Sequence, residues 1–179
     1  MITITIPASH FFKLLNETSF GELQNKTNAA FGDSRKQEQN TIKVIDLVIS
    51  PGEKAIQINA KTRNTNSNNT YDTNLVFLDV EYVEKGTPQA VNFTASDGQQ
   101  YYIKPLQQHR TQVQVSCSCL DFYWTFAAWN SADGSLLGPA PEPYAKKTDR
   151  APRNPTKTPG LCKHLDAVGE AVKRQGLLR

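Results

Sequence analysis

The stretch TIKVIDLVISPGEKAIQINA, residues 41–60, decides the fold class of this chain. Residues 41–50 are rich in Val and Ile and stop at a Pro-Gly pair, which predicts a strand that ends in a turn. Apolar and polar side chains alternate over residues 55–60, which predicts a second strand with one face in water. Two strands separated by a short turn favour antiparallel pairing.

Further strands are predicted on both sides of this pair, over residues 2–6, 71–83, 99–105 and 111–116. Ser19 and Glu22 have the spacing of a helix capping box, so a short helix is predicted over residues 20–30. Turn signals rather than long helices separate the strands, which favours an antiparallel sheet over βαβ units. We therefore predict an α+β fold whose N-terminal part is mainly an antiparallel sheet.

The chain has 179 residues, 38% of them hydrophobic, which suits one domain or one domain with an appendage. We divide it into a β-rich domain over residues 1–98 and a metal-binding module over residues 99–179. The module is predicted to contain a β-hairpin or loop, a proline-rich loop over about 138–160 and a helix over about 162–175. Its last part is basic, because residues 141–179 hold 9 Lys and Arg against 4 Asp and Glu. This excess suits a solvated surface or an acidic partner.

Several protein classes are excluded by composition and motifs. No run of about 18 apolar residues is present, so we expect no membrane partner. Residues 1–7 alternate Ile and Thr without a basic start, unlike a secretory signal peptide. The odd count of 3 Cys argues against a disulfide framework. The chain also lacks GxGxxG, GxxxxGK[ST], GxSxG and HExxH motifs, and we expect it not to be an enzyme.

The cysteines form a pattern typical of a metal site. Cys117 and Cys119 stand at the end of a predicted strand, where residues two apart point to the same side. Cys162 and His164 stand where the predicted C-terminal helix begins, and the positive end of a helix favours a thiolate. Three thiolates and one imidazole are an accepted ligand set for structural zinc. The sequence therefore predicts a Cys3His metal site.

The four residues allow three other interpretations. Free cysteines also pack as small buried hydrophobes. A catalytic pair of Cys162 and His164 would leave the other two thiols without a role. Three cysteines and a histidine can also hold a [4Fe–4S] cluster, which spacing alone does not separate from zinc, although the tight spacing of both pairs favours zinc.

The pattern C-x-C-x(n)-C-x-H resembles the SWIM-type zinc finger, in which a short β-hairpin and a following helix close around zinc. Position by position, this resemblance implies Cys117, Cys119, Cys162 and His164 as the zinc ligands. The spacer between the two pairs, residues 120–161, is long for that family.

A second resemblance covers residues 99–179 and extends beyond the four ligands. The strings VQVSCSCLDFYWTFAAWN (113–130), LLGPAPEPY (136–144) and RNPTKTPGLCKHLDAVGEAV (153–172) are together similar to a family of tailed-bacteriophage virion proteins. This resemblance implies a structural component of the virion, in the baseplate of a contractile tail or in the neck. Its partners would be other virion proteins, in several copies of a symmetric assembly put together in the host cytoplasm. The alternative is a SWIM-type nucleic-acid-binding protein, against which the small net charge argues.

The spacer is rich in aromatic residues and prolines. The aromatic cluster over residues 121–129 is predicted to pack over the metal site and exclude water from the sulfurs, although such rings can also stack on bases. The basic, proline-rich segment over 138–160 favours extended conformations and is suited to crossing a neighbouring subunit, or else is a plain surface loop.

Overall fold

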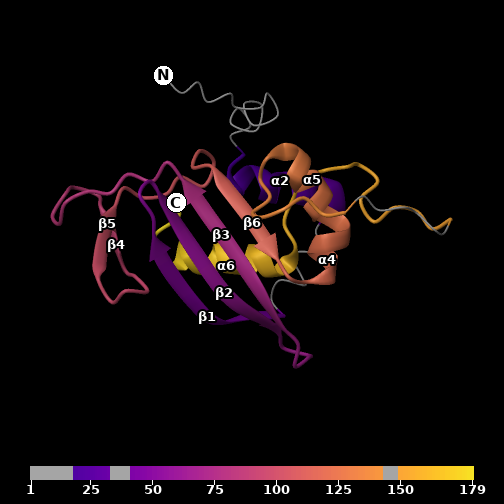
Figure 1. The fold of residues 1–179 in the computed structure, drawn as a ribbon, viewed down its shortest axis with the longest axis horizontal. Helices are drawn as coiled ribbons and strands as arrows, with labels where there is room; N and C mark the ends of the chain where they lie inside the picture. The colour runs from indigo at the N-terminus through magenta and orange to yellow at the C-terminus, as the bar shows by residue number, and fades with distance from the viewer. Residues whose placement is uncertain (1–17, 33–40, 143–148) are drawn as a thin grey trace, which may run out of the picture.

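The fold is seen in a computed structural model, which describes residues 18–32, 41–142 and 149–179. The strand predicted over residues 2–6 lies outside the described residues. The predicted α+β class is confirmed, because an antiparallel sheet of four strands packs against helices (Figure 1).

The sheet has the strand order β1-β2-β3-β6. Its strands are β1 (Ile42–Pro51), β2 (Ala55–Asn64), β3 (Thr70–Leu78) and β6 (Val113–Cys117), and every neighbouring pair is antiparallel. The two strands predicted over residues 41–60 are confirmed, and β2 runs further than expected. The strand predicted over 71–83 is too long, because the chain turns at Asp79, where φ is +54°. Tyr82 instead pairs with Ile103 in a separate bridge.

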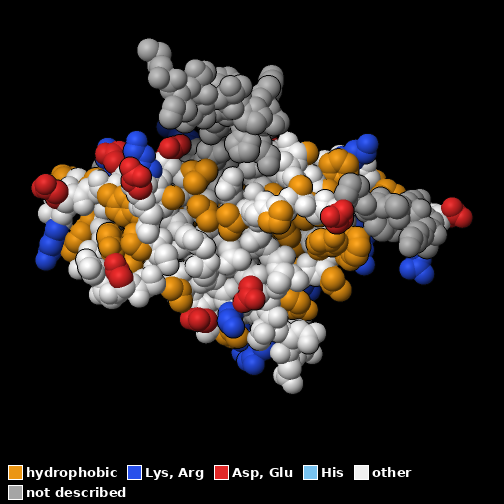
Figure 2. Space-filling view, in the orientation of Figure 1, with side chains coloured by type: hydrophobic (Ala, Val, Ile, Leu, Met, Phe, Trp, Pro, Cys, Tyr) orange, Lys and Arg blue, Asp and Glu red, His pale blue; other side chains and the backbone are white. Residues whose placement is uncertain are grey.

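One face of the sheet is apolar and the other is polar. On β2, Ile56, Ile58 and Ala60 are buried, while Gln57 and Lys61 on the opposite face are exposed. Helix α6 (Lys163–Arg174) lies across the apolar face and packs against all four strands (Figure 1). In the space-filling view, most of the opposite face is white, with scattered hydrophobic side chains among the polar ones (Figure 2). Helix α6 confirms the helix predicted over residues 162–175.

Helix α2 (Phe20–Phe31) confirms the helix predicted from the capping box. The Ser19 hydroxyl accepts a hydrogen bond from the Glu22 amide, and the Glu22 carboxylate accepts one from the Ser19 amide. The helix packs on α6 through Phe20, whose ring occupies the space where a side chain at Gly169 would stand. A glycine is required there because the two helices approach so closely.

Two pairs of elements differ from the prediction. The strand predicted over 99–105 is the shorter β5 (Gln100–Ile103), and it pairs with β4 (Val91–Thr94), which was not predicted. The spacer after Cys119 is helical at its start. The helix α4 (Leu120–Phe122), the π-helical turn η1 (Tyr123–Ala127) and the helix α5 (Ala128–Asp133) follow one another without a break.

A single hydrophobic core joins both predicted parts of the chain. Its buried members run from Phe20 to Leu178 and include residues of all four strands of the sheet. The predicted boundary at residues 98 and 99 falls between β4 and β5, which pair with each other. Among the described residues, no helix combines the length and apolarity needed to cross a bilayer.

Candidate metal centre

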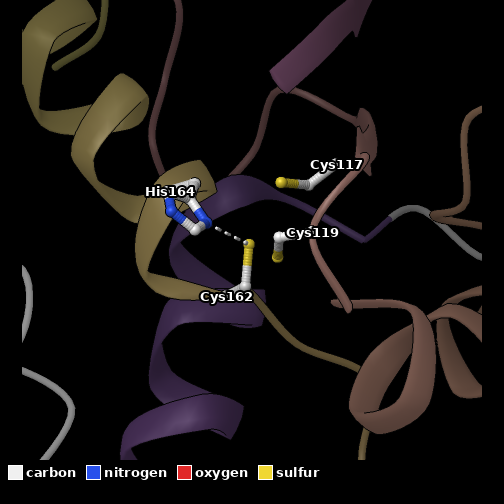
Figure 3. Close-up of side chains that lie close together, drawn as sticks. All are labelled: Cys117, Cys119, Cys162 and His164. Carbon is white, nitrogen blue, oxygen red and sulfur yellow. Dashed lines mark hydrogen bonds between the residues drawn. The ribbon is translucent and has the colours of Figure 1, made fainter. Parts of the chain in front are cut away.

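The structure brings the four predicted ligands together. Cys117, Cys119, Cys162 and His164 form one group in which the ligand atoms all lie within 4.8 Å of one another. Figure 3 shows the three sulfurs and the imidazole meeting between the end of β6 and the start of α6. All four residues are buried, with exposed fractions between 0% and 8%. The group could hold a metal ion.

Strand β6 and the turn after it position the first two sulfurs. Cys117 is the last residue of β6 and lies opposite Thr73 on β3, whose hydroxyl is 3.7 Å from the Cys117 sulfur. Cys119 is the extended residue before α4, and its sulfur accepts a hydrogen bond from the Phe122 amide at 3.3 Å. An amide donor to a sulfur favours its thiolate form. The strand therefore ends with two sulfurs directed to one point.

The start of α6 positions the other two ligands. Cys162 is the N-cap residue of this twelve-residue helix and has an extended backbone. Its sulfur makes no capping hydrogen bond to the backbone of the helix. The partial positive charge of the helix start favours a thiolate at this place. The Cys162 sulfur lies 4.0 Å from Nδ1 of His164. The His164 ring rests against Tyr71, with ring centroids 4.5 Å apart.

A buried polar network fixes the segment that leads to Cys162. The Asn130 side chain on α5 donates to the Gly160 carbonyl at 3.1 Å and accepts from the Gly160 amide at 2.8 Å. The next amide, that of Leu161, donates to the Thr27 hydroxyl on α2 at 2.8 Å. These three bonds fix the backbone of Gly160 and Leu161, the two residues that directly precede Cys162.

A second amide side chain anchors the earlier part of the same segment. The buried Asn154 donates to the carbonyls of Thr125 and Thr158, both at 2.8 Å, and accepts from the Thr158 amide at 3.1 Å. The sequence did not identify Asn130, Asn154 or Thr27 as supporting residues. The one signal was the resembling strings, since VQVSCSCLDFYWTFAAWN ends at Asn130 and RNPTKTPGLCKH contains Asn154 and Gly160.

The aromatic cluster over 121–129 packs over the site only in part. Phe122, whose amide donates to the Cys119 sulfur, and Phe126 are both buried in the core. Tyr123 and Trp124 face outward and are 41% and 45% exposed. A helix turns successive side chains through all directions, so a continuous aromatic run cannot all face the sulfurs.

The three thiols hold their protons unequally. Hydrogen bonds from the Cys117 and Cys162 thiols lower the pKa of Cys119 far below its usual range. The bond to Cys119 raises the pKa of Cys117 to about 12, and burial raises the pKa of Cys162 well above its usual range. Cys119 is therefore the first of the three thiols to lose its proton. Three thiolates at this depth need a cation, since isolated buried charges are strongly unfavourable.

The geometry and the donor atoms fit a tetrahedral zinc ion. Zinc bonds of about 2.3 Å to sulfur and 2.0–2.1 Å to nitrogen place neighbouring ligand atoms about 3.5–3.8 Å apart. The observed separations reach 4.8 Å, so each side chain needs to move inward by less than about 1 Å. Sulfur and imidazole donors suit zinc and related soft metals rather than Mg²⁺ or Ca²⁺.

The chain was compared with known proteins at the levels of family, sequence and structure. No family model, no curated protein and no solved structure matches it.

Proposed function

We propose that the Cys3His group holds a structural zinc ion, and that the chain is a non-enzymatic structural protein of a tailed-phage particle. The observation that carries the metal assignment is the convergence of four buried ligands from two distant segments. Each part of this proposal has its own experiment.

The closed surroundings of the group favour a structural role over a catalytic one. Four protein ligands fill a tetrahedral shell, whereas catalytic zinc keeps one position for water or substrate. The hollow beside Cys162, lined also by Gln24, Thr27 and Leu161, has a volume of about 10 Å³. That is at most the room one water molecule needs, so no substrate reaches the sulfurs from this side.

The ion would join the two parts of the chain that the helical and proline-rich spacer separates. Cys117 ends a strand of the sheet and Cys119 follows it in the turn before α4, while Cys162 and His164 stand at the start of the helix that covers the sheet. A structural zinc ion contributes on the order of 10 kcal/mol to folding where the site does not exist in the unfolded chain. In a reducing cytoplasm, a metal serves this purpose where a disulfide does not persist.

Elemental analysis of the purified chain tests the metal assignment. We expect one zinc per chain and a colourless protein, with Cys162→Ser as the matched variant that loses the zinc. A [4Fe–4S] cluster would instead give iron and a broad absorption band near about 400 nm in anaerobically purified protein. Protein that binds neither metal, even after refolding with zinc under reducing conditions, would overturn the assignment.

The virion role is supported by the resemblance over residues 99–179. The structure gives a physical reason for several positions of the resembling strings, since Asn154, Gly160 and Cys162 all take part in building the site. A protein of the baseplate or neck would contact other virion proteins in a symmetric assembly. Mass spectrometry of purified phage particles whose genome encodes this chain tests the virion role. Absence of the chain from mature particles would refute that role.

A further inference from the structure

A groove lined by three tyrosines lies at the end of the molecule that carries the β4–β5 hairpin. Tyr82, Tyr101 and Tyr102 line it together with Pro51 at the end of β1 and Glu53 in the turn between β1 and β2. The groove is shallow and open to solvent, with a volume of about 550 Å³. It is separate from the Cys3His group, because none of the four ligands lines it.

The tyrosines are fixed in place before any partner arrives. The Tyr82 hydroxyl donates to the Ala55 carbonyl at 2.8 Å, and the Tyr101 hydroxyl donates to the Asp97 carboxylate at 2.7 Å. The Tyr82 and Tyr101 rings meet edge to face, with centroids 6.0 Å apart, and Tyr101 also stacks on Phe93. Rigid rings lose little conformational entropy on binding, which favours affinity.

The chemistry of this groove suits a proline-rich segment that carries arginine. Aromatic grooves bind extended proline-rich peptides, because such peptides are already stiff and present flat apolar rings. Glu53 is the single charged side chain among the residues that line the groove. A carboxylate beside tyrosine faces favours a guanidinium, which pairs with the carboxylate and stacks on the rings.

The chain itself carries an exposed segment in which two arginines stand on either side of a proline. Residues 149–153 read DRAPR, and Arg150, Pro152 and Arg153 are all exposed. The base of the segment is fixed by the buried Asn154. In an extended proline-type helix, residues three apart lie on the same side, so Arg150 and Arg153 would present one basic edge.

The groove and the segment lie at opposite ends of the molecule. Figure 1 shows the β4–β5 hairpin at one end of the longest axis and the described part of the proline-rich loop reaching out at the other. The segment of one chain therefore does not reach the groove of the same chain. It does extend away from the body, free of the sheet and of the helices that cover it.

From this arrangement we infer that the tyrosine groove of one copy binds the segment 149–153 of a second copy. The contact is head to tail, since it joins two different surfaces. Repetition of such a contact closes into a ring, of which a reciprocal two-fold pair is the smallest, or continues as a helical array. The inference needs no metal chemistry and extends beyond the proposed zinc site.

The oligomeric state of the full chain under reducing conditions tests the inference. Light scattering during gel filtration is measured over a range of concentrations for the wild type and for Glu53→Arg, which places like charges together. We expect wild-type association to rise with concentration and Glu53→Arg to weaken it by at least about fivefold. The triple variant Glu53→Arg, Arg150→Glu, Arg153→Glu restores the opposite charges and is expected to recover association.

A matched control and a peptide make the result specific. Asp46→Arg reverses an exposed acidic residue on β1 outside the groove, and it should leave association unchanged. A synthetic peptide of residues 149–155 should bind the wild-type chain in calorimetric titration and dissociate the assembly. Equal association of wild type and Glu53→Arg would overturn the inference. Peptide binding by a chain that stays monomeric at all concentrations would overturn the second copy as the occupant.

Discussion

Gly160→Ala is the substitution whose cost follows most directly from the structure. A methyl group at Gly160 would stand within contact distance of the Thr27 hydroxyl and 2.8 Å from the Cε1 carbon of Phe126. Neither neighbour is free to move away. The Thr27 hydroxyl donates to the Leu23 carbonyl and accepts from the Leu161 amide, both at 2.8 Å. The Phe126 side chain is fully buried.

The magnitude combines two effects. Overpacking a close-packed core costs about 1–3 kcal/mol. Displacing Thr27 leaves the buried Leu161 amide without its acceptor, which costs about another 1–3 kcal/mol. We therefore expect a loss of about 2–6 kcal/mol, a large part of the roughly 5–15 kcal/mol typical of a folded domain. At about 2–4 °C per kcal/mol for a chain of this size, Tm should fall by about 4–24 °C.

The assay is thermal and urea unfolding of both proteins, together with a competition titration of zinc against a chromogenic chelator. Zinc affinity should fall with stability, because Gly160 lies two residues before Cys162. Gly52→Ala is the control, since a methyl group there meets the Ala55 carbonyl oxygen at 3.3 Å in an exposed turn. Wild-type stability and zinc affinity in Gly160→Ala, or an equal loss in Gly52→Ala, would refute the packing argument.

Three further outcomes are expected. Asn130→Ala should lower the free energy of unfolding in urea by about 2–4 kcal/mol, because two buried hydrogen bonds to Gly160 are lost. The control Asn59→Ala, on the polar face of the sheet, should change it by less than about 0.5 kcal/mol, and equal losses in both variants would contradict a role of Asn130 in holding Gly160. Zinc binding should release about two protons near neutral pH, because two of the three thiols have raised pKa values, and zinc affinity should therefore increase with pH. Calorimetry in buffers of different ionisation enthalpy measures the number of protons released, and a value of zero would contradict the prediction. Cobalt-loaded His164→Ala should keep its thiolate charge-transfer band but bind the metal at least about tenfold more weakly, and unchanged affinity would exclude the imidazole as a ligand.

Local patterns in the sequence were sufficient to predict most of the regular elements. Alternation of apolar and polar residues identified β2, and the capping box at Ser19 identified α2, because both signals depend on residues close together in the chain. The spacing of Cys117, Cys119, Cys162 and His164 likewise identified every residue that the structure brings into the candidate metal group. These features depend on short-range geometry that the sequence states directly.

The features that the sequence did not reveal depend on contacts between distant residues. Asn130 meets Gly160 only after α5 has folded against the returning chain, and Thr27 reaches Leu161 from α2. The helical start of the spacer was also missed, since crowded aromatic residues have modest helix propensity and tertiary packing decides their conformation. The turn at Asp79, directly after β3, was also missed, because no glycine or proline at that point indicates the end of a strand.

The double anchoring of the spacer has a consequence for engineering. Asn130 fixes the backbone of Gly160, and Asn154 fixes a point earlier in the spacer, so the segment that leads to Cys162 is held independently of what precedes it. Lengthening a closed loop is inexpensive, since doubling its length costs only about 0.6 kcal/mol. A short insertion directly after Gly138 is therefore expected to leave the positions of the four ligands unchanged, and a peptide tag could be placed there.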